Sequence, residues 1–82
     1  MNERASTNQS VAGWARLVRD RRRELDLRQE DLAALAGVST RFVHALEAGK
    51  ATAQLDKLVA VLTVLGLELR IVGPAHAEVV TL

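Results

Sequence analysis

The sequence has no cysteine and no tyrosine, and its 82 residues include one tryptophan, one phenylalanine and one proline. Without cysteine the chain can form neither a disulfide nor a thiolate metal site. Its two histidines, His44 and His76, are too far apart in sequence for a metal-ligand spacing. A domain of this size buries only about 60–65% of the surface that its unfolded chain exposes. We therefore expect a second subunit to supply stability.

Several functional classes find no support in the sequence. It has no glycine-rich phosphate loop and no combination of histidine, carboxylate and nucleophile that suits catalysis, so we predict neither an enzyme nor a cofactor. No positively charged region is followed by an apolar run at the N-terminus, as in a signal peptide. The apolar stretch over 58–67 is too short to span a membrane. These features predict a soluble cytoplasmic protein.

Positive charge is concentrated in one segment. The formal net charge is only +1, yet residues 16–28 hold six arginines against three acidic residues. A cluster of this kind is typical of a solvated helix face and also of a surface that contacts nucleic acid. The segment by itself leaves both interpretations open.

The first third of the chain predicts one amphipathic helix. Residues 1–9 are polar and aperiodic and predict a flexible leader, and Ser10 is a candidate N-cap. Apolar residues then recur at helical spacing over residues 11–25. They are Val11, Trp14, Ala15, Val18 and Leu25. Arg22 occupies the place on this face where another apolar residue would fall.

Two short helices joined by a tight turn follow. Residues 29–36 predict a helix that ends at Gly37, a residue suited to the left-handed position after a helix. Ser39 is a candidate N-cap for a helix over 40–48, which Gly49 closes. Two helices of eight or nine residues joined by a three-residue turn describe a helix-turn-helix. Ordinary packed helix pairs can have similar geometry, so the spacing does not by itself decide the function.

The C-terminal third predicts a helix and then a strand. Thr52 is a candidate N-cap for a helix that runs to Leu65 and ends at Gly66. Apolar residues lie on more than one side of this helix, so we expect more than its own domain to bury it. They are Leu55, Leu58, Val59, Val61, Leu62, Val64 and Leu65.

Residues 67–73 alternate apolar and charged side chains, which predicts a half-buried strand. No other segment suggests a strand, so we expect this one to pair with its copy across the two-fold axis of a homodimer. Leu67, Leu69 and Ile71 would form its apolar side. Residues 74–82 are expected to be a short C-terminal tail.

Residues 28–49, RQEDLAALAGVSTRFVHALEAG, resemble the Xre/Cro phage-repressor-like helix-turn-helix family. The matching positions include the glutamine and glutamate that open the first helix, the alanine-glycine of the turn and the glutamate that ends the second helix. Arg28 departs from the pattern, because the family has threonine there. The resemblance implies a mainly α, four-to-five-helix repressor-like domain over residues 10–66. It also implies a largely buried ion pair between Arg22 and Glu47.

The resemblance further implies how the chain would bind DNA. The second helix of the pair enters the major groove, and residues near its N-terminus face the bases. The expected contact residues are Gln29, Ser39, Thr40, Arg41, His44 and Lys50. Arg41 is the candidate base reader, since its guanidinium can make two bonds to guanine, although a phosphate contact fits equally well. A homodimer would bind a palindromic operator on double-stranded DNA and be nucleoid-associated when bound.

Residues 55–73, LDKLVAVLTVLGLELRIVG, are similar to the end of HipB-like antitoxins. In these proteins a fourth helix leads into a strand that pairs between subunits. The resemblance implies a repressor of its own operon that binds a HipA-like serine/threonine kinase toxin. Two alternatives remain open: a stand-alone Xre-type repressor without a toxin partner, and a protein-interaction module that has lost DNA binding.

Overall fold

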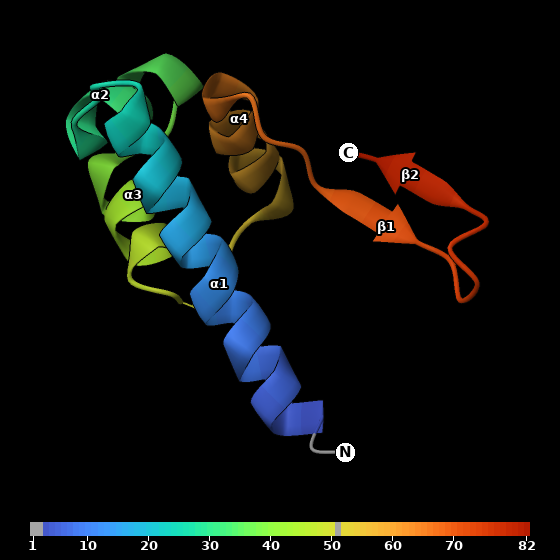
Figure 1. Ribbon diagram of the computed structural model, residues 1–82. Helices are drawn as coiled ribbons and strands as arrows, with labels where there is room; N and C mark the ends of the chain where they lie inside the picture. Colours follow the sequence, from blue (N-terminus) through green and yellow to red (C-terminus); the bar gives the residue numbers. More distant parts are fainter. Residues whose placement is uncertain (1–2, 51) are drawn as a thin grey trace.

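The computed structural model describes residues 3–50 and 52–82. In these residues the chain forms four helices and a hairpin: α1 (Glu3–Glu24), α2 (Gln29–Ala36), α3 (Thr40–Glu47), α4 (Leu55–Leu65), β1 (Arg70–Val72) and β2 (Val79–Thr81). Figure 1 shows α2 and α3 to one side of α1 and α4, and the hairpin projecting on the other side. The predicted mainly helical fold with strand structure at the C-terminal end is confirmed.

The first helix begins earlier than the sequence predicts. It starts at Glu3, so residues 3–9 are helical rather than part of a flexible leader, and Ser10 lies within the helix instead of capping it. Residues 3–10 contain neither glycine nor proline, so nothing in them stops a helix from extending toward the N-terminus. Residues 1 and 2 of the predicted leader lie outside the described residues. The helix ends at Glu24, close to Asp26, whose φ is positive at 57°.

The predicted helix pair is confirmed, with α2 over Gln29–Ala36 and α3 over Thr40–Glu47. Gly37 adopts φ 71°, a left-handed conformation that an L side chain rarely tolerates, and its N–H reaches the carbonyls of Ala33 and Ala34. Ser39 caps α3 as expected, because its hydroxyl oxygen accepts a hydrogen bond from the Phe42 N–H at 3.0 Å. Together these caps set the sharp change of direction between α2 and α3.

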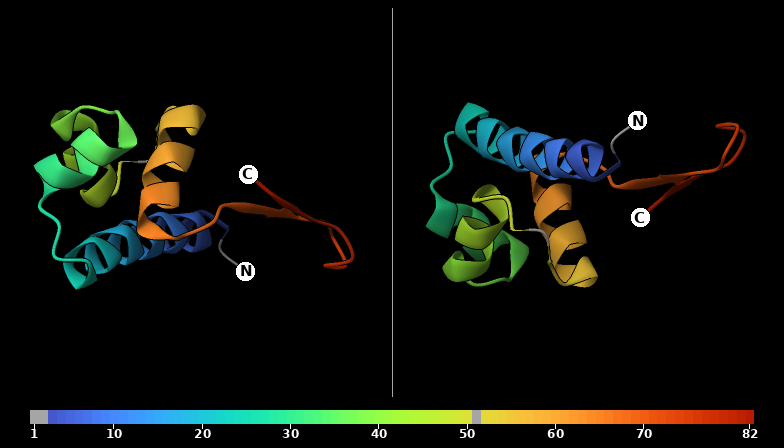
Figure 2. Two further views of the ribbon diagram at one scale, coloured as in Figure 1. Left: turned by 90° about the horizontal axis from the view of Figure 1, so that it is seen from above. Right: turned by 90° about the horizontal axis from the view of Figure 1, so that it is seen from below.

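A small aliphatic core holds the helices together. Its most deeply buried side chains, each less than 2% exposed, come from all four helices. They are Val18, Leu32, Val43, Val61 and Leu65. Burying one such side chain stabilises the fold by about 1.5–3 kcal/mol. The two views in Figure 2 agree that α1 crosses beside α4 while α2 and α3 pack at the end away from the hairpin.

The fourth helix begins later than predicted. Its N-cap is Gln54 rather than Thr52, and the helix runs over Leu55–Leu65 before Gly66 ends it at φ 72°. Leu55 is therefore in the first turn and is 54% exposed, so it does not belong to the buried side of the helix. Within the residues that the structure describes, no helix is both long and apolar enough to cross a membrane.

The expectation of one strand without a partner in its own chain is wrong. β1 pairs antiparallel with β2, with Arg70 opposite Thr81, Ile71 opposite Val80 and Val72 opposite Val79. The segment expected to be a tail thus supplies the missing hydrogen-bonding partner. The strand is also shorter than predicted, since Leu67 and Leu69 precede β1 and pack against the helical core. Of the three predicted strand residues, only Ile71 lies in β1.

Candidate nucleic-acid interface

One face of α3 is exposed and polar. Thr40, Arg41 and His44 are all exposed, whereas Val43 and Leu46 on the opposite face are buried in the core. The helix is therefore held from behind, and the three side chains at its N-terminal end are free to meet a ligand. Arg41 carries five N–H donors in a rigid fork, and Thr40 and His44 add smaller polar groups.

A basic hollow of about 310 Å³ lies beside the start of α3. Ser39, Arg41 and Lys50 line it together with Gln54 and Lys57 from the beginning of α4. Among the described residues that line this hollow, three carry a positive charge and none is acidic. The hollow therefore suits an anionic group such as a backbone phosphate.

The N-terminal end of α4 borders the same hollow. The side chain of its N-cap residue, Gln54, makes no capping hydrogen bond. The Asp56 carboxylate accepts a hydrogen bond from the Lys57 N–H at 2.9 Å. Unpaired backbone N–H groups at a helix start, together with the helix dipole, favour an anion. Lys57, in the first turn of α4, is not among the six contact residues that the sequence predicts.

The side of α3 that lies away from this basic hollow faces the start of α2. Gln29 and Thr40 line one hollow with Arg28, and Gln29 and His44 line another with Arg19 and Arg23 of α1. The six predicted contact residues therefore gather on one surface around α3. The two α1 arginines extend this surface. They belong to the basic cluster of residues 16–28 but were not singled out from the sequence.

Arg22 and Glu47 form a two-bond ion pair behind this surface. Arg22 Nε donates to Glu47 Oε2 at 2.7 Å, and Arg22 Nη2 donates to Oε1 at 2.9 Å. The side chains are 11% and 4% exposed. The remaining Arg22 nitrogen, Nη1, donates to the Leu27 carbonyl at 2.8 Å. The pair joins α1 to the end of α3 and to the loop before α2.

Gln29 is connected to this ion pair. Its Nε2 donates to Glu47 Oε1 at 3.2 Å, so the amide is held at the start of α2 by a carboxylate that Arg22 already anchors. A side chain fixed in this way loses less conformational entropy when it meets a ligand. The structure thus holds Gln29 beside the exposed face of α3 instead of leaving it free.

The surroundings of Glu47 shift its ionisation. Burial alone would raise the pKa of this carboxyl, but hydrogen bonds from Arg22 and Gln29 and the charges of Arg22 and Arg23 outweigh burial and lower the pKa below its usual value of 4.5. The hydrogen bond to Glu47 in turn raises the pKa of Arg22. Both groups are therefore charged at neutral pH.

This lowered pKa predicts a specific loss of stability in acid. Because the carboxyl has a lower pKa folded than unfolded, its stabilising contribution is complete above about pH 4.5 and falls as the pH drops through the folded value. Melting temperatures measured from neutral pH down to about pH 2.5 should fall more steeply for the parent than for Glu47→Gln. Parallel curves for the two proteins would show that Glu47 does not carry this dependence.

Arg28, where related sequences were expected to have threonine, is the N-cap residue of α2. The Asp31 carboxylate accepts from the Arg28 backbone N–H at 2.8 Å, and the Arg28 guanidinium also binds that carboxylate at 3.1 Å. These two hydrogen bonds from Arg28 lower the pKa of Asp31. The helix therefore still begins at Gln29, with the capping contact supplied by Asp31 instead of by a threonine hydroxyl.

Comparison with known proteins agrees with this geometry. A family model described as Helix-turn-helix matches residues 18–72, which include all of α2, α3 and α4. A relative from Sinorhizobium fredii (strain NBRC 101917 / NGR234) carries the name HTH-type transcriptional regulator y4mF. The two sequences are 43% identical over 76 residues, which cover 93% of this chain and 96% of the relative.

Proposed function

We propose that this chain, which belongs to the helix-turn-helix family, is a transcription regulator. In this proposal α3 enters the major groove of double-stranded DNA. The observation that carries the proposal is the exposed N-terminal end of α3, with the basic hollow on one side and Gln29 on the other. A helix that is buried behind and polar in front, with a basic hollow along one side, fits the major groove, which phosphate backbones border. The name of the Sinorhizobium relative supports the same role.

The contact residues divide into two groups by what they can reach. Thr40, Arg41 and His44 project from α3 and are proposed to meet base edges, where the pattern of donors and acceptors differs between base pairs. Gln29, Ser39 and Lys50, together with the newly placed Lys57, border the two sides and are proposed to contact phosphates. Phosphate contacts position the helix, and base contacts supply the preference for one sequence.

The salt dependence of binding tests this division. A Lys57→Ala variant is expected to weaken binding to every duplex by a similar factor and to reduce the slope of log affinity against log salt by about 1, because one phosphate contact is lost. Fluorescence anisotropy at several salt concentrations measures both quantities. Lys50→Ala removes a second proposed phosphate contact of the same hollow and should behave in the same way. A changed sequence preference in either variant would contradict a phosphate role.

Repression through a homodimer is a further part of the proposal. Two copies related by a two-fold axis would place two α3 helices in successive major grooves, so the operator would be palindromic with half-site centres about one or two helical turns apart. A regulator of this kind acts as a repressor when its operator overlaps the promoter.

The antitoxin part of the proposal rests on the resemblance of residues 55–73 to HipB-like antitoxins. The hairpin differs from that pattern, since β1 finds a partner strand in its own chain. The proposed partner is a HipA-like serine/threonine kinase toxin. Gentle purification of the tagged protein from its native cell, before and after nuclease treatment, tests the partnership. A kinase retained after nuclease supports it, and a homodimer that releases only DNA favours a stand-alone regulator.

A further inference from the structure

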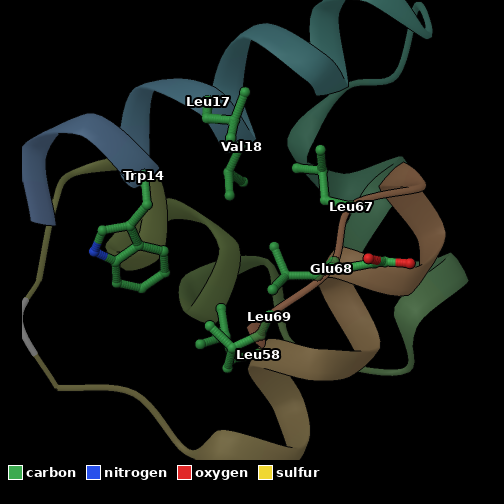
Figure 3. A pocket seen from close by; sticks show the side chains of 8 residues that line it. Trp14, Leu17, Val18, Leu58, Leu67, Glu68 and Leu69 are labelled. Atoms are coloured by element: carbon green, nitrogen blue, oxygen red, sulfur yellow. The ribbon is translucent and has the colours of Figure 1, made fainter. Parts of the chain in front are cut away.

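The first helix, α1, has two unlike sides. The side toward α4 is apolar, and Figure 3 shows Trp14 and Leu17 of α1 and Leu58 of α4 around a groove of about 370 Å³. Among the described residues that line this groove, Glu68 is the one charged residue, and its charge is negative. This side of α1 therefore has nothing to offer an anion.

The side of α1 away from Trp14 and Leu17 is basic. Arg19 and Arg23, which lie one helical turn apart, line a hollow of about 170 Å³ together with His44 of α3. We call it the α1 hollow. Like charges at this spacing on a helix repel each other. An anion bound between the two guanidinium groups would relieve this repulsion.

Two neighbouring arginines of α1 are already bound within the protein. Arg21 Nε donates to the carbonyl at the end of α4 at 2.8 Å, and Arg22 forms the ion pair with Glu47. Arg19 differs, because its Nε is buried and has no hydrogen-bond partner among the residues that the structure describes. The Asp20 carboxylate oxygen, 3.5 Å from this nitrogen, is too distant for a normal hydrogen bond. Since the Arg19 side chain is 39% exposed, its guanidinium is open to an acceptor from outside the chain.

The carboxylate that borders the α1 hollow repels an anion only weakly. Glu47 lines the hollow, but its side chain is 4% exposed, and its oxygens accept hydrogen bonds from Arg22 and Gln29. The described lining of the hollow contains three arginines against this one glutamate. The exposed rim, where Arg19 and Arg23 lie, therefore keeps a positive charge.

The α1 hollow and the basic hollow lie on different flanks of α3. His44 and Ala48 border the α1 hollow, whereas Arg41 and Ala45 border the basic hollow that contains Lys57. An α-helix with its side chains is about 10–12 Å across, and the major groove of DNA is about 12 Å wide. A helix that enters this groove therefore brings its two flanks close to the two phosphate backbones that border it.

We propose that Arg19 and Arg23 bind a phosphate of one DNA strand while the basic hollow of Lys50 and Lys57 binds the other strand. This inference rests on the proposed DNA-binding function and adds contact residues from α1 to it. The buried ion pair ties α1 to the end of α3, so a phosphate held by α1 also fixes the angle at which α3 lies in the groove. The arginines of α1 thus serve both the fold and DNA binding.

Single charge removals separate a defined contact from diffuse attraction. Arg23→Gln is expected to weaken binding to any duplex by about 10-fold, the loss of one charged hydrogen bond, and to reduce the slope of log affinity against log salt by about 1. Arg19→Gln should match it. Arg16→Gln is the control, because Arg16 is exposed on α1 but does not line the hollow. Its effect should stay below about 3-fold, since solvent and salt screen an exposed charge.

Equal weakening by Arg16→Gln and Arg23→Gln would overturn the proposal, because α1 would then attract DNA only through its total charge. The melting temperature of each variant shows that it is folded. Arg23 is exposed, so its replacement should leave the fold intact even if Arg19→Gln destabilises the chain.

Uncharged phosphates locate the contact. In a duplex that the parent binds, each phosphate in turn is replaced by a methylphosphonate, and the affinities of the parent, Arg23→Gln and Lys57→Ala are measured. We expect the parent to be sensitive at one set of phosphates on each strand. Arg23→Gln should lose sensitivity at one set and Lys57→Ala at the other, since a contact can be removed only once. An Arg23→Gln variant that is as sensitive as the parent at every phosphate would overturn the proposal.

The same measurements distinguish failure of this inference from failure of the proposed function. If the parent binds no duplex, the proposed function is wrong and the inference that rests on it fails too. If the parent binds DNA and Arg41→Ala changes its sequence preference, while Arg19→Gln and Arg23→Gln bind like Arg16→Gln, only the α1 contact is wrong. Loss of sensitivity at one set of phosphates in Arg23→Gln alone supports both.

Discussion

Replacing Glu47 with glutamine is expected to lower the free energy of unfolding by about 3–5 kcal/mol. The substitution keeps the size of the side chain but removes the negative charge that faces Arg22, whose side chain is only 11% exposed. The guanidinium would remain charged and largely buried with its charge uncompensated. A domain of 82 residues has a total stability of about 4–12 kcal/mol. Urea unfolding followed by circular dichroism should therefore show a large part of the stability lost.

The exposed glutamate of α2 supplies the matched control. Glu30 pairs with Arg28 at 2.7 Å, but the two side chains are 59% and 74% exposed. Glu30→Gln should change stability by no more than about 1 kcal/mol, because solvent screens that ion pair. If Glu47→Gln and Glu30→Gln unfolded at the same urea concentration, this result would contradict a structural role for the buried pair.

A double variant distinguishes a buried charge from a lost contact. Arg22→Met combined with Glu47→Leu removes both charges and leaves apolar side chains of similar volume. Such replacements of a buried ion pair are often neutral or stabilising. We expect the double variant to be more stable than Glu47→Gln, and a double variant that is less stable would show that the hydrogen bonds of the pair matter more than its charge balance.

Arg41→Ala is expected to cost about 1–3 kcal/mol of DNA-binding free energy and to relax the preference at one base pair. Arg41 is exposed on α3, next to the hollow that holds Lys50 and Lys57. Its planar fork matches two acceptors on guanine, and alanine offers neither hydrogen bond nor charge. Competition binding against a set of single-base-pair variants of the operator measures both the loss and its position.

The matched control for this prediction lies on the hairpin. Arg70 is exposed in β1 of the hairpin, and its guanidinium binds Glu68 at 2.6 Å. Arg70→Ala should leave both affinity and preference close to those of the parent. An Arg41→Ala variant that binds every operator variant more weakly by one common factor would assign Arg41 to a phosphate instead of a base.

The helix pair could be predicted because its signals are local. Gly37 and Ser39 define the end of α2 and the start of α3 through backbone conformation and one capping bond, and both depend on adjacent residues only. The start of α4 is different. Thr52 has the chemistry of a cap, yet packing of Leu58, Val61 and Leu65 in the core fixes the helix, and that helix begins at Leu55.

The alternation of apolar and charged residues did not predict the second strand of the hairpin. The segment over 74–82 was expected to be a tail, but Gly73 and Pro74 begin a loop in which the Gly73 N–H donates to the Glu78 carbonyl at 2.8 Å. The signal was present in Val79, Val80 and Thr81, three successive β-branched residues of high strand propensity. Alternation did not reveal them because both faces of β2 are exposed.

The residues of the candidate interface also divide into those that the sequence predicts and those that only the packing of the helices reveals. The family resemblance supplied the ion pair of Arg22 with Glu47, and this pair explains the arginine on the apolar face of α1. The hydrogen bond from Gln29 to Glu47 and the position of Lys57 beside Arg41 depend on how three helices pack. Contacts between elements distant in sequence have no local signal, so these two features required the structure.

Selection of binding sites from a random pool of double-stranded DNA tests whether the N-terminal end of α3 recognises a sequence. The full chain and Arg41→Ala would be used in parallel at physiological salt. We predict that the full chain enriches an inverted repeat with half-site centres about one or two helical turns apart, and that Arg41→Ala loses preference at one position of each half-site. No enriched sequence for the full chain, or the same sequence for both proteins, would contradict recognition through the N-terminal end of α3.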